Sequence, residues 1–218
     1  MKKIEDIERL AQHNQKLADH ESQLAKKEKI LSNKLKSRIK ARRSLIKKEM
    51  EIANIRKALA EKNQELVNKR LEISQEDIMD FPENLLNHEK EYALFNEKLA
   101  ENLIELTNLY LEVIEIEALI ATSREKLANN NLKMAKIRSV LAQQQYKYAR
   151  TLKLQPDNEK VIKMEMDYLS KQKDLKKVYS HVEKDVKDLI EKKNKLAELS
   201  KKISLNLAVR EKLRLHEN

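Results

Sequence analysis

Nine basic side chains are the residues of this sequence whose type and spacing indicate a binding function. At about 100° per residue, the first four fall within roughly 60° of one another on a helix, and the others gather on the outer face of a later helical stretch. Cations collected on one face attract an extended anionic partner, such as a nucleic acid or an anionic membrane surface. The nine candidate binding residues are Lys36, Lys40, Arg43, Lys47, Lys133, Lys136, Lys147, Arg150 and Lys153.

Both basic stretches lack the acidic residues that normally accompany Lys on a solvated helix. No Asp or Glu lies between Glu28 and Glu49, and residues 118–156 hold one acidic and eight basic side chains, after nine acidic and two basic in residues 83–117. A solvated coiled-coil face usually mixes Glu with Lys for support at i,i+4, and these stretches do not. We interpret them as binding faces, with a merely solvated face as the open alternative. Arg38 and Arg42 are predicted to lie in the helical seam, paired with carboxylates.

Catalysis, metal binding and nucleic-acid reading find little support. The chain has no Gly for a phosphate-binding loop and no Cys, and its five His are dispersed, so we expect no enzyme, no cofactor and no metal. His13 and His20 lack a third ligand, and Ser180 beside His181 would point away from it on a helix. Residues 34–73 resemble a basic leucine zipper only superficially. The same heptad also runs upstream of the basic segment, which argues against nucleic acid.

The elements that position the basic residues are three long helices. Ala, Glu, Lys, Leu and Arg make up 122 of the 218 residues, and apolar residues recur every seventh position in three phases, starting at Leu10, Tyr92 and Val161. Each phase change falls at a proline, Pro82 or Pro156, which suits the start of a helix. The sequence predicts helices over about 1–73, 82–154 and 158–217, with a short turn at 74–81 and a tip at 155–157.

Near-equal lengths and tight corners predict that the helices fold back on one another. A lean 40% hydrophobic and 4% aromatic share indicates one elongated domain over 1–218. The expected fold is all-α, an elongated antiparallel three-helix coiled coil. The seam of the first helix, Leu10 to Ile73 beside small residues such as Ala11 and Ala60, is thin and predicts burial by a second chain, hence a homodimer.

Neither a signal peptide nor a run of 18 apolar residues is found, which predicts a cytoplasmic protein.

Residues 146–193 resemble the BAR domain superfamily, with the eisosome-type and ciliary-type members closest. The resemblance lies in a basic helix end, a short tip containing proline and a third helix rich in Lys and Glu: YKYARTLKL, QPDNEK and VIKMEMDYLSKQKDLKKVYSHVEKDVKDLIEKK.

The resemblance implies a crescent-shaped antiparallel homodimer that presents basic side chains to anionic phospholipid. The expected function is that of a non-catalytic scaffold, peripheral to the membrane, that senses or shapes curved anionic membrane. The alternative is a cytoskeletal or scaffold coiled coil that bridges protein partners without binding lipid. Higher assembly and other protein partners remain open under either hypothesis.

Overall fold

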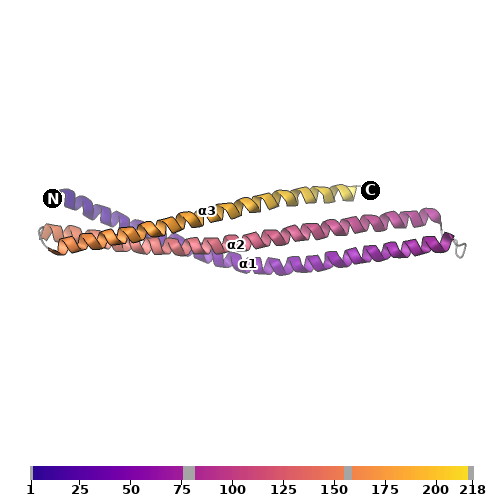
Figure 1. The fold of residues 1–218 in the computed structure, drawn as a ribbon, viewed down its shortest axis with the longest axis horizontal. Helices are drawn as coiled ribbons and strands as arrows, with labels where there is room; N and C mark the ends of the chain where they lie inside the picture. Colours follow the sequence, from indigo (N-terminus) through magenta and orange to yellow (C-terminus); the bar gives the residue numbers. More distant parts are fainter. Residues whose placement is uncertain (1, 76–81, 155–158, 216–218) are drawn as a thin grey trace. The chain divides into compact units, whose positions relative to one another are not determined.

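The computed structural model describes residues 2–75, 82–154 and 159–215, and these residues form three long α-helices. They are α1 (Lys2–Gln75), α2 (Glu83–Leu154) and α3 (Glu159–Leu215), and no strand occurs in these three ranges (Figure 1). The prediction of an all-α fold with three long helices is confirmed.

The helix ends reflect the chemistry of the prolines and their surroundings. The Pro82 carbonyl accepts hydrogen bonds from the backbone amides of Leu85 and Leu86, at 2.9 and 3.2 Å. Pro82 therefore caps α2, which begins at Glu83. α1 continues through Ser74 and Gln75, two residues past its predicted end. The rest of the predicted turn, 76–81, and the whole predicted tip, 155–157, lie outside the described residues.

Contacts between residues divide the chain into two compact units, and each unit contains parts of all three helices. Unit 1 comprises Met1–Ser37 and Ala118–Lys193, and unit 2 comprises Arg38–Glu117 and Asn194–Asn218. Nothing in this division tests the prediction of one elongated domain, which stays a prediction.

Mostly small side chains form the buried line between α1 and α2 in both units. We call this set the alanine column; one residue in seven of each helix belongs to it, and all its members are buried. In α1 it consists of Ala11, Ala18, Ala25, Ser32, Ile39, Ile46, Ala53, Ala60 and Val67. In α2 it consists of Leu86, Ala93, Ala100, Thr107, Ile114, Ala121, Ala128, Ala135, Ala142 and Ala149. The Ser32 hydroxyl donates to the Ala121 carbonyl, so the two backbones approach closely where the side chains are small.

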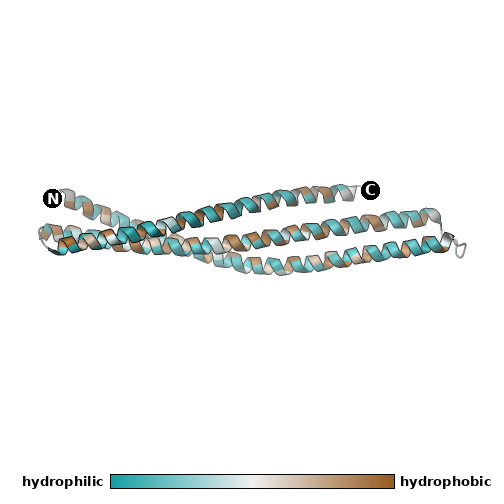
Figure 2. Cartoon of the chain, viewed as in Figure 1, coloured by the Kyte–Doolittle hydropathy of each residue, from teal (hydrophilic) through white to brown (hydrophobic). Residues whose placement is uncertain are grey.

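Most of the larger apolar residues of α1 lie outside this line. We call them the leucine column: Leu10, Leu17, Leu24, Leu31, Leu45, Ile52, Leu59, Leu66 and Ile73, all exposed. Within the single chain this seam is therefore not buried, and the prediction that a second chain covers it stays a prediction. Alanine occupies the line between α1 and α2 because its small side chain lets two helices pack at short range, and the leucines then project beside the contact. Figure 2 shows brown apolar residues recurring along each helix between teal polar ones.

Between α2 and α3 the predicted seam of α2 is largely buried. Leu106, Val113, Ile120, Met134 and Leu141 are buried, whereas Tyr92 in the same heptad position is exposed. On α3, Val161 and Leu199 are its buried apolar residues within the described range. α3 therefore contributes a thinner apolar face than α2.

Candidate cationic surface

One flank of the α1–α2 contact in unit 1 is marked by three cross-helix contacts. Lys36 forms an ion pair with Glu125, the Ser139 hydroxyl donates to the Gln15 side chain at 3.1 Å, and Lys153 lies 3.6 Å from Glu8. Residues 125, 139 and 153 are fourteen apart, two heptads, so they lie in one row along α2. We call this side the cationic flank.

Four predicted binding residues lie just outside that row. Lys136 and Arg150 are each three residues before a member of the row, so they lie one turn away and about 60° further round α2. Lys133 and Lys147 are a further three residues back. All four side chains are exposed. The structure thus gathers them on the solvent side of the cationic flank in unit 1.

The leucine column lies on the other flank of the same contact. There Arg138 pairs with Glu21, and the Asn14 amide donates to the Gln145 side chain at 3.0 Å. Leu17 and Leu24 are adjacent to these residues on the α1 surface, three to four positions away. Unit 1 therefore carries these four exposed cations and its exposed leucines on opposite flanks of the α1–α2 contact.

Unit 2 repeats the division with its own contacts. Arg43 lies 3.8 Å from Glu115, and Lys57 donates to Glu101 at 2.9 Å. Lys40 and Lys47 stand three residues before and four residues after Arg43, so both lie on this cationic flank, and both are exposed.

The two seam arginines behave differently from each other. Arg42 is half-buried on the leucine flank of unit 2 and donates to Glu117 at 2.6 Å, in agreement with the prediction. Arg38 is exposed and makes no ion pair within the described ranges, so its predicted place in a buried, carboxylate-paired seam is wrong. It interrupts the leucine column between Leu31 and Leu45.

Ion pairing separates the nine predicted residues into two groups. Lys36, Arg43 and Lys153 are tied to carboxylates of the facing helix, and the hydrogen bond from Lys36 lowers the pKa of Glu125. The other six make no ion pair with any described residue; the Arg150 guanidinium lies 5.6 Å from the centre of the Tyr146 ring. The six are Lys40, Lys47, Lys133, Lys136, Lys147 and Arg150.

Sequence reasoning missed the carboxylates of α2 that neutralise part of the basic run of α1. Glu115, Glu117 and Glu125 each pair with a basic residue of α1. The signal was present in part in the sequence, because Glu115 and Glu117 belong to the acidic stretch 83–117 and their partners Arg43 and Arg42 belong to the basic run of α1. The acid-free stretch of α1 is therefore less unusual than it looks in one dimension.

A polar cluster between α2 and α3 in unit 1 was also missed. The Asp185 carboxylate is only 4% exposed and accepts from Asn130 at 2.6 Å and from Lys126 at 2.9 Å. One turn along, Asp188 accepts from Ser123 at 2.8 Å and from Lys192 at 2.6 Å.

These bonds also set the proton affinities of the cluster. Hydrogen bonds from Lys192 and Ser123 lower the pKa of Asp188, and the bond to Asp185 raises the pKa of Lys126. Because each charge in the cluster has a partner, the cluster fixes how α3 sits on α2 in unit 1.

Other kinds of site find no support in the part of the chain that the structure describes. Its His, Asp and Glu residues nowhere gather in a group of three that could hold a metal ion. None of the described helices has a stretch long and apolar enough to cross a membrane. No family model matches the sequence, and no curated protein matches it.

Proposed function

We propose that this chain is a non-catalytic scaffold that binds curved anionic membrane through its cationic flank, as a BAR-like antiparallel homodimer at the cytoplasmic face of a membrane. The observation that carries the proposal is a set of four exposed cations in unit 1. Lys133, Lys136, Lys147 and Arg150 share one side of α2 and have no carboxylate partner among the described residues. Glu125, the one acid in residues 118–154, is already bound to Lys36.

The antiparallel coiled coil is part of this proposal and is supported by the order of the contacts. In unit 1, residues 8, 15 and 36 of α1 contact residues 153, 139 and 125 of α2, so the numbers fall on one helix as they rise on the other. In unit 2, Lys57 and Arg70 meet Glu101 and Glu89 in the same reversed order.

The energy of such binding would come from many weak attractions. Near an anionic membrane surface each Lys or Arg contributes about 1 kcal/mol, so four cations per chain and eight per dimer suffice at low salt. The attraction acts over about one Debye length, roughly 8 Å at physiological ionic strength. Binding should therefore weaken steeply as salt is added.

The test is co-sedimentation with phosphatidylserine or phosphoinositide vesicles. Reversing the charge of Lys133, Lys136, Lys147 and Arg150 to Glu should lower vesicle affinity by about a hundredfold or more at low salt. Circular dichroism should show unchanged helicity, because none of these side chains pairs with a described carboxylate. Lys36 and Arg43 are left out because their substitution would break contacts between α1 and α2.

The matched control reverses four exposed lysines of α3, Lys163, Lys173, Lys176 and Lys177, which changes the net charge by the same amount. Vesicle binding should survive this change in large part. Equal loss in both variants would reduce the effect to net charge, and binding that ignores salt would contradict the proposal.

The alternative, a scaffold coiled coil that bridges proteins without lipid, is favoured by one observation. The leucine column is exposed along α1 in both units, as expected of a helix that packs against a helix of another protein. Under this alternative neither charge variant would change localisation in cells.

A further inference from the structure

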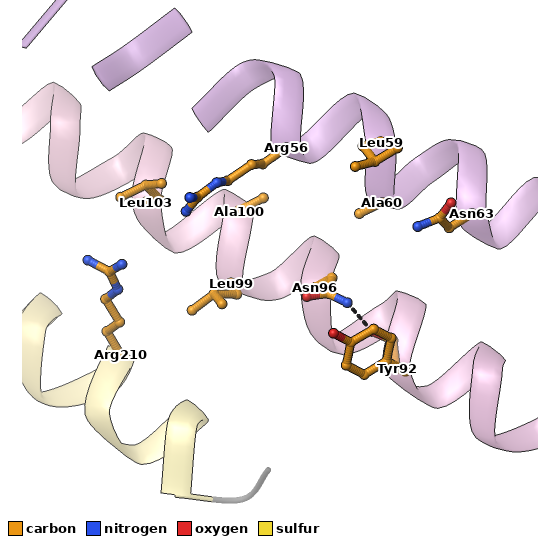
Figure 3. A pocket seen from close by; sticks show the side chains of 10 residues that line it. All are labelled: Arg56, Leu59, Ala60, Asn63, Tyr92, Asn96, Leu99, Ala100, Leu103 and Arg210. Carbon is orange, nitrogen blue, oxygen red and sulfur yellow. Dashed lines mark hydrogen bonds between the residues drawn. The ribbon is translucent and has the colours of Figure 1, made fainter. Parts of the chain in front are cut away.

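Unit 2 contains a pocket of about 320 Å³ that is lined by residues of all three helices. Figure 3 shows Arg56 extending from α1 toward α2, with Arg210 reaching into the same space from α3. Neither Asp nor Glu is among the described residues that line the pocket. Two guanidinium groups therefore meet at a cavity whose described lining holds no carboxylate.

Arg56 belongs to a row of three arginines on the leucine flank of α1. Arg42, Arg56 and Arg70 are fourteen residues apart, two heptads, so they lie on the same side of the helix. The first and the last of them are paired with carboxylates of α2. Arg42 donates to Glu117 at 2.6 Å, and Arg70 donates to Glu89 at 2.9 Å.

The residue of α2 that corresponds to Arg56 in this row is Leu103. It stands fourteen residues before Glu117 and fourteen after Glu89, which places it midway between the two paired carboxylates. Arg56 and Leu103 both line the pocket, and Arg56 makes no ion pair with any described residue. The middle place in a row of arginine–glutamate pairs thus lacks its carboxylate.

The remaining lining suits an apolar body next to an anionic group. Leu59 of α1 and Tyr92 of α2 supply apolar side-chain surface to the pocket. A second pocket of about 190 Å³ shares Asn63 and Tyr92 with the first and extends the space along the α1–α2 contact. The charged residues that line this extension, Arg70 and Glu89, already neutralise each other. Ligand pockets usually measure about 300–1,000 Å³, so these dimensions fit a small ligand.

We propose that this pocket binds a small amphiphilic anion from solution, with a carboxylate or phosphate head on a short apolar body. The head takes the place of the missing carboxylate at Arg56, and Arg210 adds a second cation from α3. Guanidinium groups suit this role because they form charge-assisted hydrogen bonds with both kinds of oxyanion. The apolar body lies along Leu59 and Tyr92, toward the second pocket.

This site goes beyond the proposed function and does not rest on it. Arg56 lies on the leucine flank of unit 2, whereas Lys40 and Lys47 lie on the cationic flank of the same unit. All of the residues that line the pocket belong to one chain, so the site requires neither a membrane nor a second copy.

The first experiment is isothermal titration calorimetry of the full chain with octanoate and with octyl phosphate, below the concentrations at which they form micelles. Two matched probes each lack one half of the chemistry: 1-octanol has no charge, and inorganic phosphate has no apolar body. Each should bind at least about tenfold more weakly than the amphiphiles. Octanol binding equal to that of octanoate, or no binding of either amphiphile, would overturn the inference.

Arg56→Gln tests the cation at the centre of the site. The variant should bind octanoate about tenfold more weakly or worse, since it loses charge-assisted hydrogen bonds. Its helicity should be unchanged, because Arg56 is exposed and has no ion pair among the described residues. The control is Lys40→Gln, which removes the same charge from an exposed residue of the cationic flank in the same unit and should bind octanoate normally. Equal losses in the two variants would reduce the effect to net charge and overturn the inference.

A pair of substitutions at Leu103 tests the idea of a missing carboxylate directly. Leu103→Glu completes the row, and the new carboxylate should pair with Arg56 as Glu117 pairs with Arg42. Octanoate binding should then be lost. Leu103→Gln has nearly the same size without the charge and should retain most of the binding; thermal unfolding of both variants shows whether they fold equally well. Undiminished binding by Leu103→Glu would contradict the proposal.

The ligand should also hold the end of α3 through Arg210. Octanoate is expected to slow amide hydrogen exchange in the turns around Arg210 and to leave exchange in unit 1 unchanged. The same measurement on Arg56→Gln is the control and should show no slowing. An unchanged rate around Arg210 in the wild-type chain would contradict a ligand that joins α1 to α3.

Failure of this inference differs visibly from failure of the proposed function. Arg56→Gln should sediment with phosphatidylserine vesicles as the wild-type chain does. The variant with Lys133, Lys136, Lys147 and Arg150 reversed should leave vesicles and still bind octanoate. Loss of vesicle binding in Arg56→Gln would mean that the pocket takes a lipid head group of the membrane, and would overturn a ligand from solution.

Discussion

The alanine column and the leucine column are neighbours on α1 but differ in burial. Ala18 and Ala60 are 1% and 2% exposed, whereas Leu17 and Leu59, each one residue earlier, are 39% and 61% exposed. The smaller apolar side chain is buried and the larger one is left in solvent. In this chain, a residue of α1 is buried when it lies on the line between α1 and α2, whatever its size. The larger apolar side chains beside that line are left exposed, and their apolar surface is available to another partner.

The largest effect should come from a charge in the alanine column. Ala121 is fully buried, and its carbonyl accepts a hydrogen bond from the Ser32 hydroxyl. Ala121→Glu would bury a carboxylate at this position, which should lower the free energy of unfolding by several kcal/mol. Chemical denaturation followed by circular dichroism measures the loss. Leu24→Glu, in the leucine column of the same unit, is the control and should change stability far less. Similar losses in the two variants would remove the distinction between the columns.

A smaller effect should come from exchanging side-chain size between the columns. Ala53→Leu adds volume at a fully buried position and should cost about 1–3 kcal/mol. Leu24→Ala should cost less than about 1 kcal/mol, well below the roughly 2–5 kcal/mol typical of a buried leucine. Thermal and urea unfolding of both variants at low protein concentration would sharpen the comparison. A Leu24→Ala loss in the buried range would show that a second helix already covers that column.

The smallest effect should be a pH dependence of the α2–α3 contact, which is held by polar groups rather than by either column. Because hydrogen bonds from Lys192 and Ser123 lower the folded-state pKa of Asp188, their stabilisation is complete above the ordinary carboxyl pKa of about 4. The stabilisation is lost as the pH falls below that value and through the lowered pKa. Unfolding measured from neutral pH down to acid should show a shallower decline for Asp188→Asn than for the wild-type chain. Identical slopes would mean that Asp188 adds nothing.

The sequence was sufficient to predict the three helices but not to predict which face of each helix is buried. The heptads and Pro82 predict three helices because local periodicity and backbone geometry determine such elements. Which of two adjacent positions is buried depends on the distance between helices, and that distance depends on the facing side chains. Leu17 and Ala18 both fit a seven-residue repeat, so periodicity alone favoured the larger residue.

The candidate surface was predictable in part for the same reason. That Lys136 and Lys147 share an outer face follows from helical geometry within one helix. That Lys36 is tied to Glu125 and Arg43 approaches Glu115 depends on contacts between positions far apart in the sequence. Cross-helix register was therefore the missing information, and it divides the nine residues into three engaged cations and six available ones.

The hydroxyl of Ser32 on the Ala121 carbonyl has a consequence for how the chain finds its alignment. In the proposed antiparallel arrangement, stepping seven residues outward from that contact brings Ile39 opposite Ile114. Alanines that repeat every seventh residue would pack equally well if one helix shifted along the other by seven residues, so alanine alone does not define the register. The bulky and hydroxyl-bearing members of the alanine column break this degeneracy. A chain in which Ser32, Ile39 and Ile114 were all alanine would keep its helices but would favour the native alignment less strongly over one shifted by seven residues.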